Sequence, residues 1–157
     1  MRTDYTQYPA FAPAPVDFGL SVNAVLDDLS SFAGEHVAVS GILRFEFEGA
    51  ALDHFPGSER HEAPVGKPRE SSSLWLYFGS AALQSYESQF RRWNGARVIV
   101  RGSLSGPLFH GGCGYLSAWP AELMALSIRR LDRPEEVDAS SLHPVRRRLR
   151  RDHQLPP

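Results

Sequence analysis

The stretch GEHVAVSGILRFEF, residues 34–47, alternates apolar and polar side chains along most of its length. Period-two alternation of this kind is typical of a β-strand with one buried face. The face expected to be buried carries Val37, Val39, Gly41, Leu43, Phe45 and Phe47. A glycine inside a strand often marks a bend or a bulge. We therefore predict a long first strand that bends at Gly41 and serves two sides of a small barrel.

Three further strands are predicted between residues 50 and 104. Residues 50–55, AALDHF, are the expected second strand. In LWLYF, residues 74–78, one face carries Leu74, Leu76 and Phe78, and the other carries Trp75 and Tyr77. In GARVIVRGSL, residues 95–104, the inward face carries Val98, Val100, Gly102 and Leu104, and the outward face carries Arg97, Ile99 and Arg101. The polar residues 61–73 between the second and third strands are expected to form a mobile loop.

The stretch AELMALSIRRL, residues 121–131, fits two kinds of element. It contains good helix formers, but Met124, Leu126 and Ile128 also alternate as they would in a strand. We predict a strand, because the barrel would otherwise lack its closing strand. Helix remains the alternative for this segment.

Two helices are predicted from their caps and their apolar periodicity. The first covers residues 20–32, with Ser21 as its N-cap and Gly34 as its stop. The second begins at Ser80 and ends at the Asn94–Gly95 pair. Its apolar face recurs at helical spacing and carries Leu83, Tyr86, Phe90 and Trp93.

The order of elements is strand, strand, strand, helix, strand, strand, over about residues 20–131. With GEHVAVSG, LWLYF and GARVIVRG at their positions, this order resembles the OB-fold. The preceding helix, SVNAVLDDL, is similar to the extra helix of many small bacterial OB-fold proteins. The resemblance implies an all-β fold with minor α content: a five-stranded Greek-key barrel with an N-terminal helix and a helix between strands 3 and 4. An SH3-like barrel and a split α+β sheet are the alternatives.

Three regions are expected along the 157 residues. Residues 1–19 are a proline-rich segment, whose aromatic side chains would dock on the barrel or on a partner. Residues 20–133 are the OB-fold domain, and residues 134–157 are a polar and then arginine-rich tail without regular structure. No signal peptide and no membrane span are recognised, and a single cysteine excludes an internal disulfide. We expect a cytoplasmic protein.

Charge is distributed unevenly along the chain. Five arginines and one aspartate give residues 146–152 a charge of +4, while the net charge of the whole chain is −1. The remainder therefore carries −5, whereas nucleic-acid-binding barrels usually present a basic face. This balance favours a protein partner over nucleic acid.

The resemblance implies a ligand face on strands 2 and 3. Trp75 and Tyr77 would stack bases there, and Arg44, Arg97 and Arg101 would contact the nucleic-acid backbone. In the alternative reading, the two aromatic side chains are covered by the N-terminal segment or by a protein partner. Glu46 and Glu48 share the face of Arg44 and favour this second reading.

Two further segments contribute candidate partner contacts. The glycine-rich loop PLFHGGCGY, residues 107–115, contains Phe109, His110 and Cys113. One histidine and one cysteine do not make a zinc site, so we predict a structural loop with no metal and no cofactor. The basic tail supplies Arg146, Arg147 and Arg148, which could bind nucleic acid or an acidic protein surface.

No catalytic triad, carboxylate pair, dinucleotide motif or phosphate-binding loop is recognised in the sequence. We therefore predict that the chain is not an enzyme. The primary hypothesis is a non-catalytic OB-fold module that binds a protein, as an adaptor or an immunity-type inhibitor does. The alternative is a binder of single-stranded DNA or RNA, and the weakest is an enzyme or metalloprotein built on His110 and Cys113.

Overall fold

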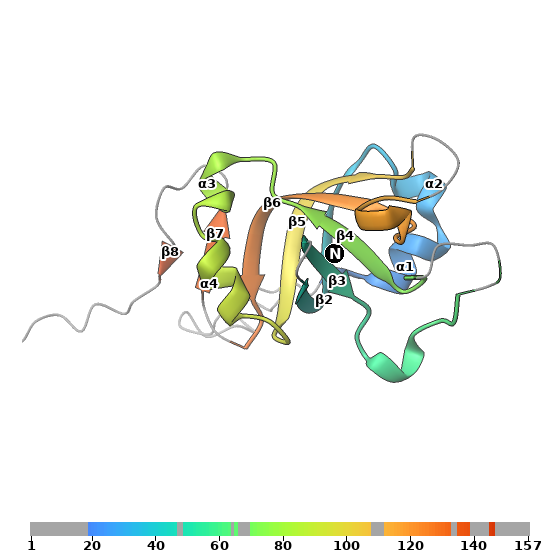
Figure 1. The fold of residues 1–157 in the computed structure, drawn as a ribbon, viewed down its shortest axis with the longest axis horizontal. Coiled ribbons are helices and arrows are strands. Elements are labelled where there is room, and N and C mark those ends of the chain that lie inside the picture. The colour runs from blue at the N-terminus through green and yellow to red at the C-terminus, as the bar shows by residue number, and fades with distance from the viewer. Residues whose placement is uncertain are drawn as a thin grey trace, which may run out of the picture.

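The computed structural model of the chain describes residues 19–46, 49–63, 65, 70–107 and 112–132, together with the backbone of residues 135–138 and 145–146. Strands predominate, and the described strands belong to one eight-stranded sheet (Figure 1). The strands are β1 (Leu20–Ser21), β2 (His36–Glu46), β3 (Gly49–Asp53), β4 (Ser73–Tyr77), β5 (Arg97–Ser105), β6 (Glu122–Arg130), β7 (Glu135–Asp138) and β8 (Val145–Arg146). The helices are α1 (Val22–Asp27), α2 (Leu29–Phe32), α3 (Ala81–Gln84) and α4 (Glu87–Arg92), with two 3₁₀ turns, η2 (Gly57–Glu59) and η3 (Tyr115–Ser117).

Five of the strands pair in a closed ring. β2 pairs with β3, β3 with β4, β4 with β6, β6 with β5, and β5 again with β2. All of these pairs are antiparallel except β4 and β6, which run parallel. The prediction of a mainly β chain with few helices is confirmed. The predicted number of five strands is too small, because β1, β7 and β8 extend the sheet beyond the ring.

Strand β2 serves two sides of the ring, as Gly41 predicts. Residues 36–42 of this strand pair with β5, and residues 42–46 pair with β3. A Cβ atom on Gly41 would overlap the carbonyl oxygen of Asp53 on β3. Glycine is therefore required here for the close approach of two backbones, which lets one strand change partner.

The interior of the ring is filled by the predicted apolar faces, and the helices cover its two ends (Figure 1). Val39, Leu43, Leu74, Val98 and Val100 are all fully buried in one core cluster. That cluster also takes in Val22 and Val25 of α1 and Leu83 and Phe90 of α3 and α4.

Both predicted N-caps are confirmed by hydrogen bonds. The Ser21 side chain accepts from the backbone N–H of Ala24, and the Ser80 side chain accepts from that of Leu83. Each predicted helix is divided into two short ones, α1 and α2 in the first case and α3 and α4 in the second.

The segment 121–131 is a strand, but its buried face differs from the alternation that suggested one. Leu123, Ala125 and Ile128 are buried, while Met124 and Leu126 are each 36% exposed. The register shifts by one residue where β6 passes Arg101 and Gly102 of β5. This irregularity moves the buried apolar position from odd to even numbers along β6, and Ser127 beside Ile128 is buried as well.

Two other expectations are corrected. Ile99, expected on an exposed face, is only 1% exposed. The segment after residue 133 is not entirely irregular, because β7 pairs with β6 and β8 pairs with β7. At the ends of the loop predicted at residues 61–73, the His61 N–H donates to the Ser72 hydroxyl at 2.7 Å and the His54 N–H to the Ser72 carbonyl at 2.9 Å, and residues 64 and 66–69 lie outside the described residues.

Candidate binding face

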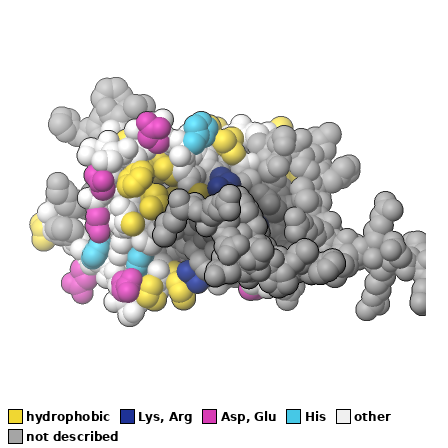
Figure 2. Space-filling model, turned by 180° about the vertical axis from the view of Figure 1, so that it is seen from behind, with side chains coloured by type: hydrophobic (Ala, Val, Ile, Leu, Met, Phe, Trp, Pro, Cys, Tyr) yellow, Lys and Arg dark blue, Asp and Glu magenta, His cyan; other side chains and the backbone are white. Residues whose placement is uncertain are grey.

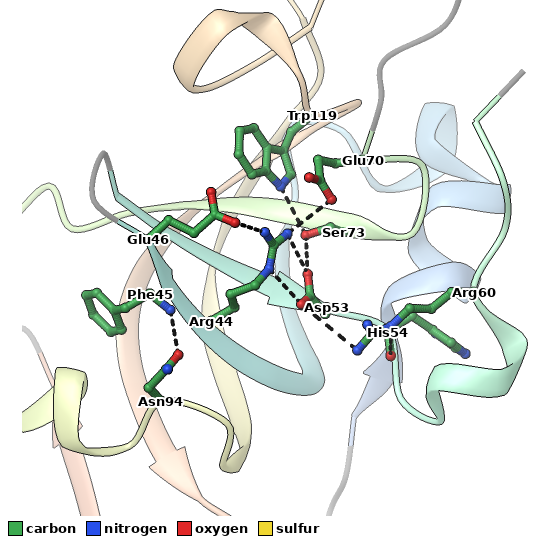
Figure 3. Close-up of polar contacts among 10 residues, drawn as sticks. All are labelled: Arg44, Phe45, Glu46, Asp53, His54, Arg60, Glu70, Ser73, Asn94 and Trp119. Carbon is green, nitrogen blue, oxygen red and sulfur yellow. Dashed lines mark hydrogen bonds and ion pairs between the residues drawn. The ribbon is translucent and has the colours of Figure 1, made fainter. Parts of the chain in front are cut away.

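A buried carboxylate organises the outer surface of β2, β3 and β4. Asp53, at the end of β3, is 6% exposed. Arg44 of β2 donates to both of its oxygens, from Nε at 2.8 Å and from Nη2 at 3.0 Å (Figure 3). Ser73 of β4 donates a third hydrogen bond to Oδ1 at 2.7 Å. The bidentate pair and the hydroxyl join three adjacent strands through one side chain.

Arg44 is held by two more carboxylates. Its Nη2 lies 3.1 Å from Glu70 Oε2, and its Nη1 contacts Glu46 (Figure 3). Burial opposes the charge of this guanidinium, but the hydrogen bonds and charges of Asp53, Glu70 and Glu46 outweigh it and raise the pKa of Arg44. The Arg44 guanidinium, which was predicted to contact the phosphates of a nucleic acid, therefore donates its hydrogen bonds to carboxylates of the same chain.

A polar cavity of about 310 Å³ adjoins this cluster. Besides Arg44 and Asp53 it is lined by Arg60, His61, Glu70 and Ser71–Ser73. Arg60 donates from Nε to the carbonyl of His54 at 3.0 Å, which places its guanidinium 3.9 Å from Asp53. Both signs of charge are therefore present, and each basic group already faces a carboxylate or carbonyl of the chain.

His54 has a structural role beneath the cavity. It is 3% exposed, its Nδ1 accepts from the backbone N–H of Asn23 at 3.1 Å, and its Nε2 lies 3.0 Å from Glu59. Because Nδ1 accepts, the proton of the neutral ring is on Nε2 and is donated to Glu59. These contacts connect α1, β3 and η2, and they engage both ring nitrogens.

Of the two alternatives predicted for Trp75, base stacking or cover by other groups, its packing favours cover. Its ring packs against Trp119, with centroids 4.6 Å apart and an interplanar angle of 57°. Cβ atoms on Gly49 and Gly114 would overlap the Trp75 ring, so both backbones lie directly against it. Trp119 is 3% exposed and donates from Nε1 to the Ser73 hydroxyl at 3.0 Å. The chain itself therefore covers part of Trp75, which is half-buried, while Tyr77 is 49% exposed.

The segment that covers Trp75 is a constrained loop. The backbones of Cys113 and Trp119 exchange hydrogen bonds of 2.6 and 3.1 Å across its base. At its tip Leu116 and Ser117 have φ values of 54° and 53°, in the left-handed region that non-glycine residues seldom enter. Each such residue costs about 1–2 kcal/mol. Even so, Leu116 is 79% exposed.

Exposed apolar side chains gather on β4, β6 and this loop. Among the described residues, seven large hydrophobic side chains are exposed, and five of them belong to these segments. We call these five the β4–β6 apolar strip: Tyr77, Tyr115, Leu116, Met124 and Leu126. Tyr77 and Met124 are register partners, and a Cβ on Gly79 would lie within 3.1 Å of both.

Carboxylates accompany the β4–β6 apolar strip. Glu122 pairs with Trp75 in the parallel register, and the Glu70 N–H donates to the Ala118 carbonyl of the loop at 2.9 Å. Glu46 extends from the end of β2, with half of its side chain exposed. The strip therefore has an acidic border.

The other predicted contact residues lie elsewhere or outside the described residues. Arg97 and Arg101 pair with β2 from β5, on the side of β2 opposite to β3. Arg97 places its guanidinium 4.3 Å from the Phe55 ring centroid. Arg146 is described only as backbone in β8, and Phe109, His110, Arg147 and Arg148 lie outside the described residues. The structure thus places the Arg44 guanidinium 5.9 Å from the Trp119 ring centroid, and Trp119 packs on Trp75, whereas Arg97 and Arg101 lie on the other side of β2.

The thiol of Cys113 is poorly suited to nucleophilic chemistry. Burial, and after it the negative charge of Glu122, raise the pKa of this thiol above its ordinary value. At neutral pH the thiolate fraction is therefore smaller than that of an unperturbed cysteine.

We expect Cys113 to react with iodoacetamide at pH 8 several-fold more slowly than free cysteine, because only the thiolate attacks. Glu122→Gln removes the repelling charge, so it should lower the thiol pKa and raise the rate. Glu87→Gln, on the exposed face of α4, is the matched control and should leave the rate unchanged. A wild-type rate equal to that of free cysteine would contradict the expected protonation of this thiol.

Within the described ranges, no three histidine, cysteine, aspartate or glutamate side chains are arranged to hold a metal ion. None of the helices in the same ranges has both the length and the apolar character needed to cross a bilayer. No known protein family matches this sequence, and no curated protein is significantly similar to it.

Proposed function

We propose that the chain is a non-catalytic OB-fold module that binds a protein partner through the β4–β6 apolar strip. The OB-fold assignment is supported by the closed ring of β2, β3, β4, β6 and β5. It is also supported by the single parallel pair β4–β6 and by the helices between β4 and β5. In OB-folds the loop before the last strand borders the ligand site. Residues 112–121 occupy that place here.

One observation supports the choice of a protein partner: five of the seven exposed large hydrophobic side chains among the described residues belong to β4, β6 and the loop before β6, where Glu122 and Glu70 also lie. Aromatic and methionine side chains are enriched in protein interfaces, and apolar patches on a surface commonly mark them. Tyr77 and Met124 meet across β4 and β6 at the centre of the strip. The carboxylates of Glu46, Glu70 and Glu122 would repel nucleic-acid phosphates and attract basic groups of a protein.

Binding of single-stranded nucleic acid is the second candidate, favoured by the exposure of Tyr77 and of Arg101 on β5. Two observations weigh against it. Arg44 is directed at three carboxylates, and Trp75 is packed under the loop. Figure 2 views the molecule from behind Figure 1. Its coloured part shows small, separate basic areas among acidic and hydrophobic ones.

Titration with fluorescein-labelled oligo(dT) and oligo(U) separates the two candidates. We expect no saturable binding to either oligonucleotide at about 50 mM salt, because Arg44, the arginine described on this face, is already engaged by three carboxylates. Binding that weakens steeply between about 50 and 200 mM salt would support the nucleic-acid candidate instead. Tyr77→Ser then shows whether that binding uses this face.

Affinity capture with matched variants tests the protein-binding proposal. The wild-type chain and Val65→Asp should recover the same stoichiometric protein from cells of the native host, because Val65 is fully exposed outside the strip. Met124→Asp should lose it, since a charge at the centre of an apolar interface costs about tenfold or more in affinity. Equal recovery by Met124→Asp and wild type would overturn the proposal that this strip is the interface.

A further inference from the structure

We propose that Leu116 is a pre-positioned anchor, which inserts into an apolar pocket of the partner whose rim carries lysine or arginine side chains. This inference rests on the proposed protein-binding function and specifies the partner's chemistry. It is carried by three features of residues 112–119: the exposure of Leu116, the constraint on the loop, and the carboxylates around it.

The first feature is an exposed leucine in an unfavourable conformation. Leu116 is 79% exposed, and its φ of 54° is followed by 53° at Ser117. Glycine or asparagine would adopt these angles more readily. Strained residues of this kind persist where the surrounding structure over-determines them, and they concentrate at functional sites.

The second feature is the rigid base on which the leucine stands. A Cβ on Gly112 would overlap the carbonyl oxygens of Ser117 and Trp119, so the two arms of the loop are in contact. Beneath the loop, Trp119 is fixed by its 3.0 Å hydrogen bond to Ser73. An anchor already held in its bound position loses little conformational freedom on binding, which increases affinity.

The third feature is the charge around the anchor. Glu70 is hydrogen-bonded to the loop through Ala118, and Glu122 is close enough to affect the Cys113 thiol. Arg44 faces three carboxylates, those of Glu46, Glu70 and Asp53, so this group retains a net negative charge. A partner pocket with a basic rim would pair with these carboxylates, whereas a phosphate chain would be repelled by them.

The thermal stability of Leu116→Gly shows whether Leu116 serves to bind a partner or to stabilise its own loop. Leu116→Gly relieves the positive φ and removes a side chain that buries little surface, so the midpoint of thermal unfolding should stay the same or rise. Binding should nevertheless fall. A leucine that mainly stabilised the loop would instead show a lowered midpoint in this variant, and that result would overturn the assignment.

The binding test uses phage-displayed random peptides selected on the full chain and then synthesised. We expect the enriched peptides to combine aliphatic or aromatic residues with a positive net charge, and to bind more weakly as salt increases. Their affinity should fall about tenfold or more for Leu116→Gly and remain unchanged for the control Val65→Gly. Glu70→Gln and Glu122→Gln should each weaken binding and reduce its dependence on salt.

Three outcomes would overturn the anchor. They are the enrichment of neutral or acidic peptides, binding of the peptides to Leu116→Gly as tightly as to wild type, and the enrichment of no peptide. If peptide binding is lost in Tyr77→Ser but retained in Leu116→Gly, the anchor is wrong and the protein-binding strip stands. If neither peptides nor a captured protein bind, the proposed function fails together with the anchor.

Discussion

Replacing Asp53 by alanine is expected to lower the free energy of unfolding by about 3 kcal/mol. The substitution leaves the Arg44 guanidinium beside an empty site and deprives the Ser73 hydroxyl of its acceptor. Removing one partner of a buried ion pair costs about 3–5 kcal/mol, and the lower end applies because a quarter of the Arg44 side chain is exposed and because Glu46 and Glu70 still face its charge. Urea denaturation followed by circular dichroism measures the change.

The double variant Arg44→Met/Asp53→Leu is the matched control. It replaces the ion pair with apolar side chains of similar length, and such replacements are often neutral or stabilising. We expect it to recover most of the stability that Asp53→Ala loses. A loss below about 1 kcal/mol in Asp53→Ala would mean that the cluster does not hold β2, β3 and β4 together as described.

Trp119→Ala is expected to cost about 3–5 kcal/mol, in the range found for large aromatic side chains removed from a core. Trp119 is 3% exposed, packs on Trp75, and hydrogen-bonds to Ser73. Its loss should also uncover Trp75, so acrylamide should quench the remaining tryptophan fluorescence more strongly than in wild type. Urea denaturation measures the stability, and quenching under native conditions measures the exposure.

Trp119→Phe distinguishes the contribution of aromatic packing to stability from that of the hydrogen bond to Ser73. Phenylalanine keeps most of the aromatic packing but cannot donate to Ser73, so the expected loss is smaller, and the hydrogen bond accounts for about 1 kcal/mol of it. If Trp119→Ala were as stable as wild type, the loop would not depend on this residue. The rigid base inferred for Leu116 would then be wrong.

The local patterns of the sequence predict much of the ring. Alternation predicts β2 and β5, Gly41 predicts the change of partner along β2, and the serine caps predict where α1 and α3 begin. Each of these features depends on neighbours in sequence or on a single backbone requirement. They can therefore be predicted from a single sequence.

The candidate site was less predictable because its contacts join distant segments. The cover over Trp75 comes from Gly49 and from the loop that holds Gly114 and Trp119, and no periodicity connects these positions. The residues Leu116–Ser117 contain no glycine, so their left-handed backbone leaves no mark in the sequence. The outward charge of Arg44 suggested phosphate binding, since its partners Asp53 and Glu70 lie nine and 26 residues further along the chain.

The buried face of β6 and the existence of β7 and β8 could not be predicted from the sequence patterns, for physical reasons. The register shift in β6 reverses which residues are buried halfway along the strand, so no single alternation describes it. The backbone of β7 and β8 pairs with an existing edge of the sheet, and edge pairing can proceed with polar side chains. Composition alone therefore indicated a tail at these positions.

Hydrogen exchange of the chain, alone and saturated with the captured partner, shows which face the partner covers. We expect slower exchange on binding in residues 73–77 and 112–126, which carry the β4–β6 apolar strip, and little change in residues 97–101 of β5. Protection confined to the β5 side of β2, or no protection in the strip, would contradict the assignment of this face as the protein interface.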